Sequence, residues 1–289
     1  MKSLFPSFQT IRFQDRILSL ERPAIMGILN ITPDSFYEGS RVLDLEICRE
    51  RAAGMIALGA TFLDVGGHST RPGAAFVSEQ EEIDRVVPVI AMLREAFPKV
   101  IISIDTYRLA VAKAGFAAGA HVFNDIGAGQ MDEGIFEWVA EAKIPYVLTH
   151  SVGKFEAVHD VPNYKQVVEE VWSNLASKLQ QLRKLGAEDV FLDPGFGFSK
   201  SLEHNYELLA HLENFLLLGA PLLVGLSRKT MIYKELGITA AESLNGTSVL
   251  HTIALQKGAS VLRVHDVAEA IEVVHLVEKI KQYGISNLV

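Results

Sequence analysis

The chain has 289 residues, 49% of them hydrophobic, which is long enough to bury a large core. Its formal net charge is −8 and Lys and Arg form no long run, so a nucleic-acid partner is not expected, because phosphate backbones require a basic surface. No apolar stretch reaches membrane length, the N-terminal residues hold no long apolar signal region, and Cys48 is the single cysteine, so we expect no membrane partner and a cytoplasmic location.

The first predicted element is a β-hairpin. Residues 8–20 alternate between apolar and polar side chains and break at a polar turn, Gln14-Asp15-Arg16. This hairpin precedes the repeating pattern of the rest of the chain. We therefore expect it to cover the N-terminal end of a barrel.

From Ile25 onward, short apolar strand signals alternate with amphipathic helical stretches. The expected helices cover residues 44–58, 79–96, 107–118, 132–142, 163–185, 203–212, 243–257 and 267–282. Eight such units fill residues 1–289 without a linker, which predicts one domain, an α/β fold of the (β/α)8 TIM-barrel type. An open doubly wound sheet is the competing fold, but it typically uses fewer strands.

Each of the eight apolar runs leads into a residue capable of chemistry. These residues are Asn30, Asp64, Asp105, Asn124, His150, Asp193, Ser227 and Arg263. In a barrel of parallel strands, the C-terminal strand ends share one rim, and that rim carries the active site. The pattern therefore predicts an enzyme rather than a structural protein.

Acids and an amide on this rim indicate a site for a flat heterocycle. Asp105 and Asp193 would be costly to bury without partners, and Asn124 supplies both a donor and an acceptor. A ring with several N–H donors satisfies such a set. A zinc site is the rival, but the chain has no His/Cys cluster for it; paired acids for glycoside hydrolysis are another.

The end of the last strand favours anion binding. Alternation sends Arg263 and His265 to the same side, and Asp266 begins the next helix, whose free amides attract anions. The adjacent cations Arg228 and Lys229 could belong to the same site or to ordinary solvated surface. The loops over residues 30–40 and 66–74 could be functional or plain turns.

With these residues placed, the chain resembles the dihydropteroate synthase family of pterin-binding barrels from Ile25 to about Ile280. The resemblance rests on five motifs in order: residues 27–36 (GILNITPDSF), 69–73 (STRPG), 193–197 (DPGFG), 225–229 (GLSRK) and 263–266 (RVHD). It implies a transferase of folate biosynthesis. Such an enzyme condenses 7,8-dihydropterin-6-ylmethyl diphosphate with 4-aminobenzoate, with Mg2+ as cofactor, and releases pyrophosphate.

The resemblance also implies roles for individual residues. The pterin ring is held by Asp105, Asn124, Asp193, Lys229 and Arg263. The diphosphate is held by Asn30, Thr70, Arg71, Arg263 and His265, with Asn30 nearest the metal. Thr70, Pro72, Phe196, Ser227 and Lys229 form the aminobenzoate pocket, which is also the sulfonamide target. Asp34 and Phe36 belong to a first loop that closes on the diphosphate, and Asp105, Lys229, Arg263 and Asp34 are the expected catalytic residues.

The chain departs from the family pattern at a few positions. His68 stands where a glutamate is common, Ser151 stands where many members carry methionine, and the first loop continues without the usual Asp-Gly-Gly. A homodimer packed through the C-terminal helices is implied. The alternatives are a corrinoid methyltransferase on the same barrel, which does not need the diphosphate residues, and a pterin-binding paralogue without turnover.

Overall fold

The computed structural model describes residues 10–13, 16–31, 41–68, 76–153 and 158–285. Eight parallel strands close into a barrel in the order β10-β3-β4-β5-β6-β7-β8-β9. Their bounds are β3 (Ala24–Asn30), β4 (Phe62–Gly66), β5 (Ile101–Asp105), β6 (Val122–Asp125), β7 (Tyr146–Thr149), β8 (Val190–Asp193), β9 (Leu222–Val224) and β10 (Ala259–Val264). The predicted (β/α)8 barrel is confirmed.

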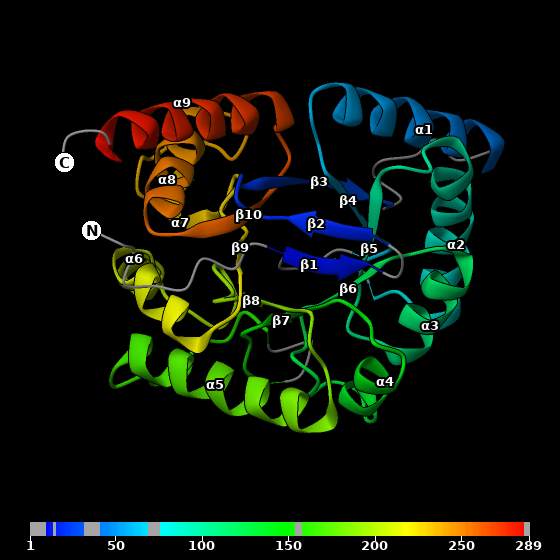
Figure 1. Ribbon diagram of the computed structural model, residues 1–289, viewed down its shortest axis with the longest axis horizontal. Coiled ribbons are helices and arrows are strands. Elements are labelled where there is room, and N and C mark those ends of the chain that lie inside the picture. Colours follow the sequence, from blue (N-terminus) through cyan, green and yellow to red (C-terminus); the bar gives the residue numbers. More distant parts are fainter. Residues whose placement is uncertain (1–9, 14–15, 32–40, 69–75, 154–157, 286–289) are drawn as a thin grey trace.

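Helices surround the barrel as a ring (Figure 1). They are α1 (Arg41–Ala57), α2 (Glu79–Ala96), α3 (Leu109–Ala118), α4 (Ile135–Glu141), α5 (Val167–Leu185), α6 (Leu202–Ala210), the 3-10 helix η3 (Leu212–Leu218), α7 (Thr230–Tyr233), α8 (Leu244–Gln256) and α9 (Val267–Ile285). All eight predicted helices are present, and the short elements η3 and α7 were not predicted. Helix α5 begins four residues later than expected, at the point where the Glu170 carboxylate accepts the N–H groups of Lys165 and Gln166.

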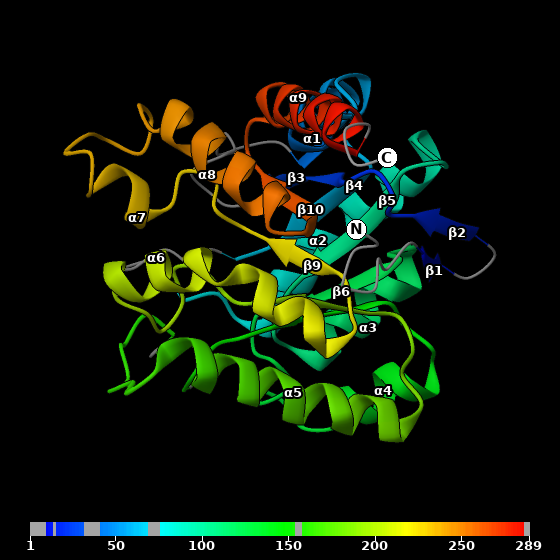
Figure 2. The same ribbon diagram turned by 60° about the vertical axis from the view of Figure 1, so that its left-hand side comes forward.

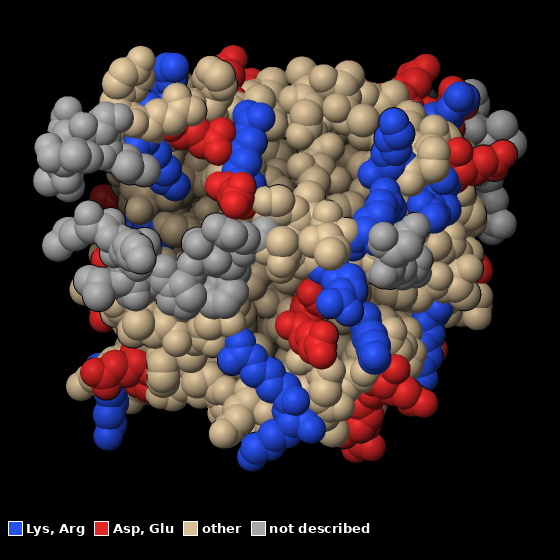
Figure 3. Space-filling view, in the orientation of Figure 1, with Lys and Arg blue, Asp and Glu red and all other residues tan. Residues whose placement is uncertain are grey.

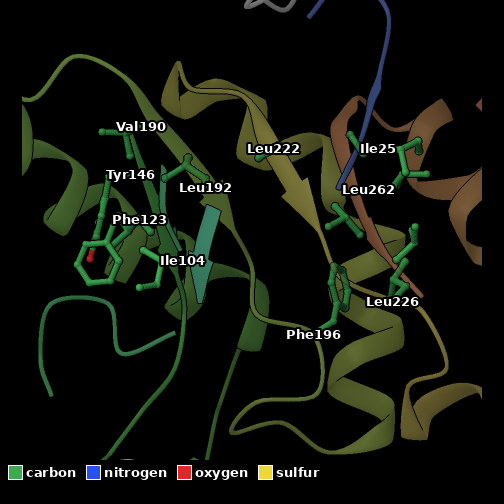
Figure 4. Close-up of a cluster of buried hydrophobic side chains, with 14 of the residues drawn as sticks. Ile25, Ile104, Phe123, Tyr146, Val190, Leu192, Phe196, Leu222, Leu226 and Leu262 are labelled. Carbon is green, nitrogen blue, oxygen red and sulfur yellow. The ribbon is translucent and has the colours of Figure 1, made fainter. Parts of the chain in front are cut away.

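Strand alternation separates two hydrophobic layers. One layer lies between strands and helices, and Ile25, Ile104, Phe123, Leu192 and Leu262 belong to it (Figure 4). The residues between these positions face the barrel interior, because successive side chains of a strand point to opposite faces. The second layer is formed by the inward residues at the N-terminal strand ends, such as Met26, Phe62 and Phe191.

The predicted hairpin is confirmed, and it covers the N-terminal end of the barrel. Strands β1 (Thr10–Phe13) and β2 (Arg16–Ser19) pair antiparallel and lie across the middle of the helix ring (Figure 1). Phe13 is 1% exposed, and its ring lies edge-on to Phe62 at a centroid distance of 5.9 Å. Phe62 makes a similar contact with Phe191 at 6.3 Å. The hairpin therefore completes an apolar layer that separates the barrel interior from solvent at this end.

The two ends of the barrel are different in character. Figure 2 shows the hairpin at one end and α7 at the other. Around the hairpin, acidic and basic side chains are interspersed over the visible face (Figure 3). Among the residues that the structure describes, no helix is both long and apolar enough to cross a membrane.

We expect Phe13→Ala to reduce the free energy of unfolding by about 3–5 kcal/mol, since it removes a buried ring from the closing layer. Urea denaturation measures this change. The control is Ile17→Ala on the same hairpin, whose side chain is 68% exposed and which should change stability by less than about 0.5 kcal/mol. A loss for Phe13→Ala as small as that of the control would show that the hairpin does not support the barrel.

Candidate active site

The polar residues of the barrel interior form two layers above the apolar closing layer. Alternation from Phe62 places Asp64 one layer further up, and strand register sets Ser103 beside it. One layer higher, Gly66 is in register with both Asn30 and Asp105, and Asn124 is in register with Asp105. The site residues therefore meet at the C-terminal mouth, because each lies at an inward-facing position near the C-terminal end of its strand.

Arg263 is the centre of this site. Its Nε donates to Asp64 Oδ2 at 2.6 Å, and a terminal nitrogen donates to Asp105 Oδ2 at 2.5 Å. Asn124 Nδ2 donates to the same Asp64 oxygen at 3.0 Å. One guanidinium thus links strands β4, β5 and β10, and Asn124 adds β6.

Burial and neighbouring charges set the ionisation of this network. Burial raises the pKa of Asp105 to about 7, against the opposing effect of Arg263 and with a further rise from Asp64. Burial alone would lower the pKa of Arg263, but the two carboxylates raise it on balance. Arg263 therefore stays charged, while Asp105 is the group whose charge is sensitive to pH near neutrality.

Lys229 lies on the opposite side of the mouth, between β9 and the loop after β8. Its Nζ donates to Phe196 O at 2.5 Å and lies 4.4 Å from the centre of the Phe198 ring. Burial lowers the pKa of Lys229 to about 8, with Asp193 opposing the shift. Burial also raises the pKa of Asp193, which accepts the N–H of Gly195 at 2.7 Å. The mouth thus holds cations and carboxylates in close proximity.

Phe196 contributes its carbonyl oxygen rather than an exposed ring. The side chain is 1% exposed and belongs to the core between strands and helices, where it is labelled in Figure 4. The aromatic face beside Lys229 belongs to Phe198. A role for the Phe196 ring in a ligand pocket stays a prediction.

Two pairs of contacts join the ends of β9 and β10. Ser227 Oγ lies 3.0 Å from His265 Nδ1 and accepts the His265 N–H at 3.1 Å. Arg228 binds Asp266 through Nε and a terminal nitrogen at 2.8 and 2.6 Å. Arg228 is therefore not solvated surface; its bidentate pair holds the segment that carries Ser227 and Lys229 against the start of α9.

Four buried polar atoms at inward positions have no hydrogen-bond partner among the described residues. They are Asp64 Oδ1, Asp105 Oδ1, Ser103 Oγ and Thr149 Oγ1. Buried polar groups in proteins are almost always paired, so a concentration of them marks a place where a polar ligand or water binds. A groove of about 560 Å³ lies at the hairpin end, next to Phe13 and Phe97, and contains none of the predicted site residues.

The sequence placed Asp64 at a strand end on the rim but gave no role for it in the site. Asp64 is two residues after Phe62 on the same strand, so alternation places both side chains inside the barrel. Alternation did not indicate that Asp64 pairs with Arg263, which is 199 positions away. Four predicted residues, Asp34, Thr70, Arg71 and Pro72, lie outside the described residues, as does Phe36. The other predicted residues all lie at the C-terminal mouth.

Two of the departures from the family pattern, His68 and Ser151, are buried, and the third, in the first loop, lies outside the described residues. His68 faces Glu82 at 3.8 Å, and the Glu82 carboxylate also pairs with Arg108 at 2.6 Å. Burial lowers the pKa of His68 to about 4, with Arg108 adding to the shift. Ser151 Oγ donates to Ile126 O at 2.7 Å and so links the loops after β7 and β6.

Asn30 supplies the one predicted metal ligand. A Cβ atom on Gly66 would lie 3.5 Å from both Asn30 Oδ1 and Asp105 Oδ2, so these oxygens flank the glycine at the mouth. Among the described residues, no three His, Cys, Asp or Glu side chains form a metal cluster. An amide oxygen with diphosphate oxygens and waters suits Mg2+, which keeps waters and takes few protein ligands.

Comparison with known proteins places the chain among enzymes that act on pterins. Residues 26–265 match the family model described as pterin binding enzyme. The dihydropteroate synthase of Escherichia coli strain K12 is 42% identical over 267 residues, which cover 92% of this chain and 94% of that protein.

Solved structures give the same result. The Xanthomonas albilineans dihydropteroate synthase with 4-aminobenzoic acid is similar with a TM-score of 0.87 and 38% identity, over 94% of this chain and 98% of that one. The same enzyme in complex with 7,8-dihydropteroate gives a TM-score of 0.84 and 35% identity over the same shares.

We expect Asp64→Asn to lower the pKa of Asp105 below about 7, because it removes a like charge that favours the protonated form and leaves Arg263 to Asp105 alone. Carboxyl carbon NMR of the side chain measures this pKa. In the control Asp189→Asn, which removes a carboxylate that caps the Arg12 N–H of the hairpin, the titration of Asp105 should not move. An unchanged titration in both variants would show that Asp64 and Asp105 are not coupled.

Proposed function

The chain belongs to the pterin-binding enzyme family and, within it, to the dihydropteroate synthases, and from this premise we propose how its residues carry out the reaction. A dihydropteroate synthase is a transferase of folate biosynthesis: it joins 7,8-dihydropterin-6-ylmethyl diphosphate to 4-aminobenzoate and releases pyrophosphate. The observation that carries the assignment of roles is the set of acceptors around Arg263, at the base of the barrel mouth, that have no partner within the described part of the chain.

The pterin ring binds in the polar layers of the interior. Its N–H donors satisfy Asp105, Asn124 and Asp193, while Lys229 and Arg263 lie against its acceptors and its face. The free oxygen of Asp105 and the buried position of Asp193, 7% exposed, support this assignment. Both acids favour a cationic ring when they are ionised.

The reaction proceeds by a dissociative route. The bond between the pterin methylene and the diphosphate oxygen breaks first, and the electron pair leaves with pyrophosphate. The neutral amine of 4-aminobenzoate then attacks the methylene cation and loses a proton. Arg263 and His265 stabilise the charge on the leaving group together with the amides at the start of α9. No strong general base is required, because the attacking amine is already neutral.

Further residues complete the site. Asn30, at the end of β3, would hold Mg2+, which would supply charge neutralisation of the diphosphate. Arg71 and Thr70 bind the same group, Asp34 belongs to the loop that closes over it, and Pro72 lines the aminobenzoate pocket. Ser227 faces that pocket and also contacts His265, so it lies between the two substrate positions.

We place the protein in the cytoplasm as a homodimer. On α9, Leu276, Ile280 and Tyr283 are 63%, 63% and 67% exposed, at spacings that form one apolar stripe along the helix. Helix α8 packs beside it and presents Val249, which is 51% exposed. Such a stripe is suited to pair with its own copy.

The dimer proposal predicts that the double variant Leu276→Glu, Ile280→Glu sediments as a monomer, because two charges would be buried in the interface. Analytical ultracentrifugation measures the change at a fixed protein concentration. The control is Leu217→Glu, an equally exposed side chain on η3, which should leave the dimer intact. If wild-type protein sediments as a monomer, the proposal is wrong.

The reaction itself is tested by incubating the protein with pterin diphosphate, 4-aminobenzoate and Mg2+ and measuring pyrophosphate. We expect pyrophosphate and dihydropteroate in equal amounts, and a loss of turnover on chelation of Mg2+. Arg263→Ala should lower turnover by at least about a thousandfold while the fold is retained, because Arg263 touches both the ring and the leaving group.

The same assay separates the alternatives. Pterin binding without pyrophosphate would identify a non-catalytic paralogue and overturn the synthase assignment. Methyl transfer from a reduced folate to a corrinoid would identify the methyltransferase. Near wild-type turnover of Arg263→Ala, with circular dichroism showing an intact fold, would contradict the role given to that residue.

A further inference from the structure

Lys200 is a buried lysine whose amino group lies inside a cradle of main-chain oxygens. Only 7% of the residue is exposed. Its Nζ lies 2.9 Å from Gly195 O, 2.9 Å from Phe198 O and 3.4 Å from His150 O, and 3.0 Å from His150 Nδ1. An ammonium group has three donors, which the two nearer carbonyls and the imidazole nitrogen take up. Its charge has no direct carboxylate partner among the described residues.

The loop after β8 is shaped to form this cradle. Gly195, Gly197 and Ser199 have φ values of 72°, 81° and 50°, in the left-handed region. These turns direct the carbonyls of Gly195 and Phe198 towards one point. A Cβ atom on Gly195 would lie 2.0 Å from His150 O, so the loop after β7 closes the cradle from the other side.

Two lysines hold this turn from opposite sides. Lys229 donates to Phe196 O from the mouth, while Lys200 donates to the carbonyls on either side of that residue from behind. Ser199, next to Lys200, accepts the Val152 N–H and bonds Val158 O, which fixes the loop after β7 to the same turn. The position of Asp193, two residues before Gly195, therefore depends on both lysines.

We propose that Lys200 is a positioning residue for the pterin site: its ammonium group locks the 195–198 turn and, through its charge, keeps the Asp193 carboxylate ionised for the N–H donors of the pterin. This inference rests on the proposed role of Asp193. Lys200 does not touch the substrate, so it acts through Asp193 and the turn.

The charges around Lys200 support this coupling. Burial lowers the pKa of Lys200 to about 7, and Asp193 opposes the shift while Lys229 adds to it. Burial raises the pKa of Asp193, against the Gly195 N–H, Lys229, Lys200 and Arg263. On the β7 side, burial lowers the pKa of His150 and Lys200 adds to the shift, so His150 is neutral and accepts from the ammonium.

The test is Lys200→Met, with kcat/KM for pterin diphosphate measured from pH 5 to pH 9. Asp105 and Asp193 both bind the ring when ionised, so activity is lost as pH falls through their pKa values. Without the Lys200 charge the pKa of Asp193 rises while Asp105 is not directly affected, and we expect the acid limb to move to higher pH. The loss of kcat/KM relative to the wild type should therefore be greatest on the acid side of the profile. The difference in kcat/KM between the wild type and Lys200→Met should become smaller above pH 7, because Lys200 of the wild type loses its proton there.

Lys178→Met is the matched control. Lys178 on α5 is 6% exposed, and burial lowers its pKa to about 8, but it lies beside Asp125, whose carboxylate caps the turn after β6 and faces away from the mouth. Its Nζ has no hydrogen-bond partner among the described residues. The charge of Lys178 adds to the lowering of the pKa of His150, but it is not among the charges that set the pKa of Asp193. The acid limb of Lys178→Met should therefore coincide with that of the wild type.

The outcomes distinguish the role of Lys200 from the proposed function. If the wild type is active and Lys200→Met has the same acid limb, the role of Lys200 is wrong and the proposed function stands. If the wild type forms no pyrophosphate, the proposed function itself is wrong. If Lys200→Met does not fold, Lys200→Gln retains two donors without the charge and must show the same shifted limb. A uniform loss at all pH values in Lys200→Gln would reduce Lys200 to a structural residue and contradict the proposal.

Discussion

Arg263 carries a positive charge into the interior of the barrel, and the two carboxylates beside it determine how that charge is held. Asp64 and Asp105 come from neighbouring strands, and each receives a hydrogen bond of 2.6 Å or less from the guanidinium. A buried ion would be very unfavourable without such partners, and removal of one partner typically costs 3–5 kcal/mol. Each acid retains one oxygen without a hydrogen-bond partner among the residues that the structure describes. The two acids therefore compensate the charge of Arg263 and can still accept donors from a ligand.

Two features of the barrel make this arrangement possible: the alternation of side chains along each strand and the apolar layer that closes one end. Inward positions are apolar at the hairpin end, where Phe13, Phe62 and Phe191 contact one another, and polar at the mouth. The closing layer excludes water from below, which strengthens electrostatic interactions above it. The same strands thus supply stability at one end and chemistry at the other.

The loop after β8 shows how main-chain geometry and charge act together. Its left-handed residues aim carbonyl oxygens at Lys200, and its next carbonyl accepts from Lys229. One lysine lies in the mouth and the other behind it, both near Asp193. A rigid turn between two cations presents a carboxylate in a fixed position, which is what preorganised binding requires.

Alternation and spacing in the sequence determined the eight strands, the hairpin and nearly every helix, since these elements depend on local periodicity. The motif residues at the strand ends were also predictable, because a parallel barrel brings those ends together. The partners of those residues were decided by the tertiary structure alone. Asp64 meets Arg263 from 199 positions away, Arg228 turns to Asp266 instead of solvent, and Lys200 enters a cradle built by two loops. Such pairings depend on strand register and loop conformation, which bring together side chains whose separation in sequence carries no signal of contact.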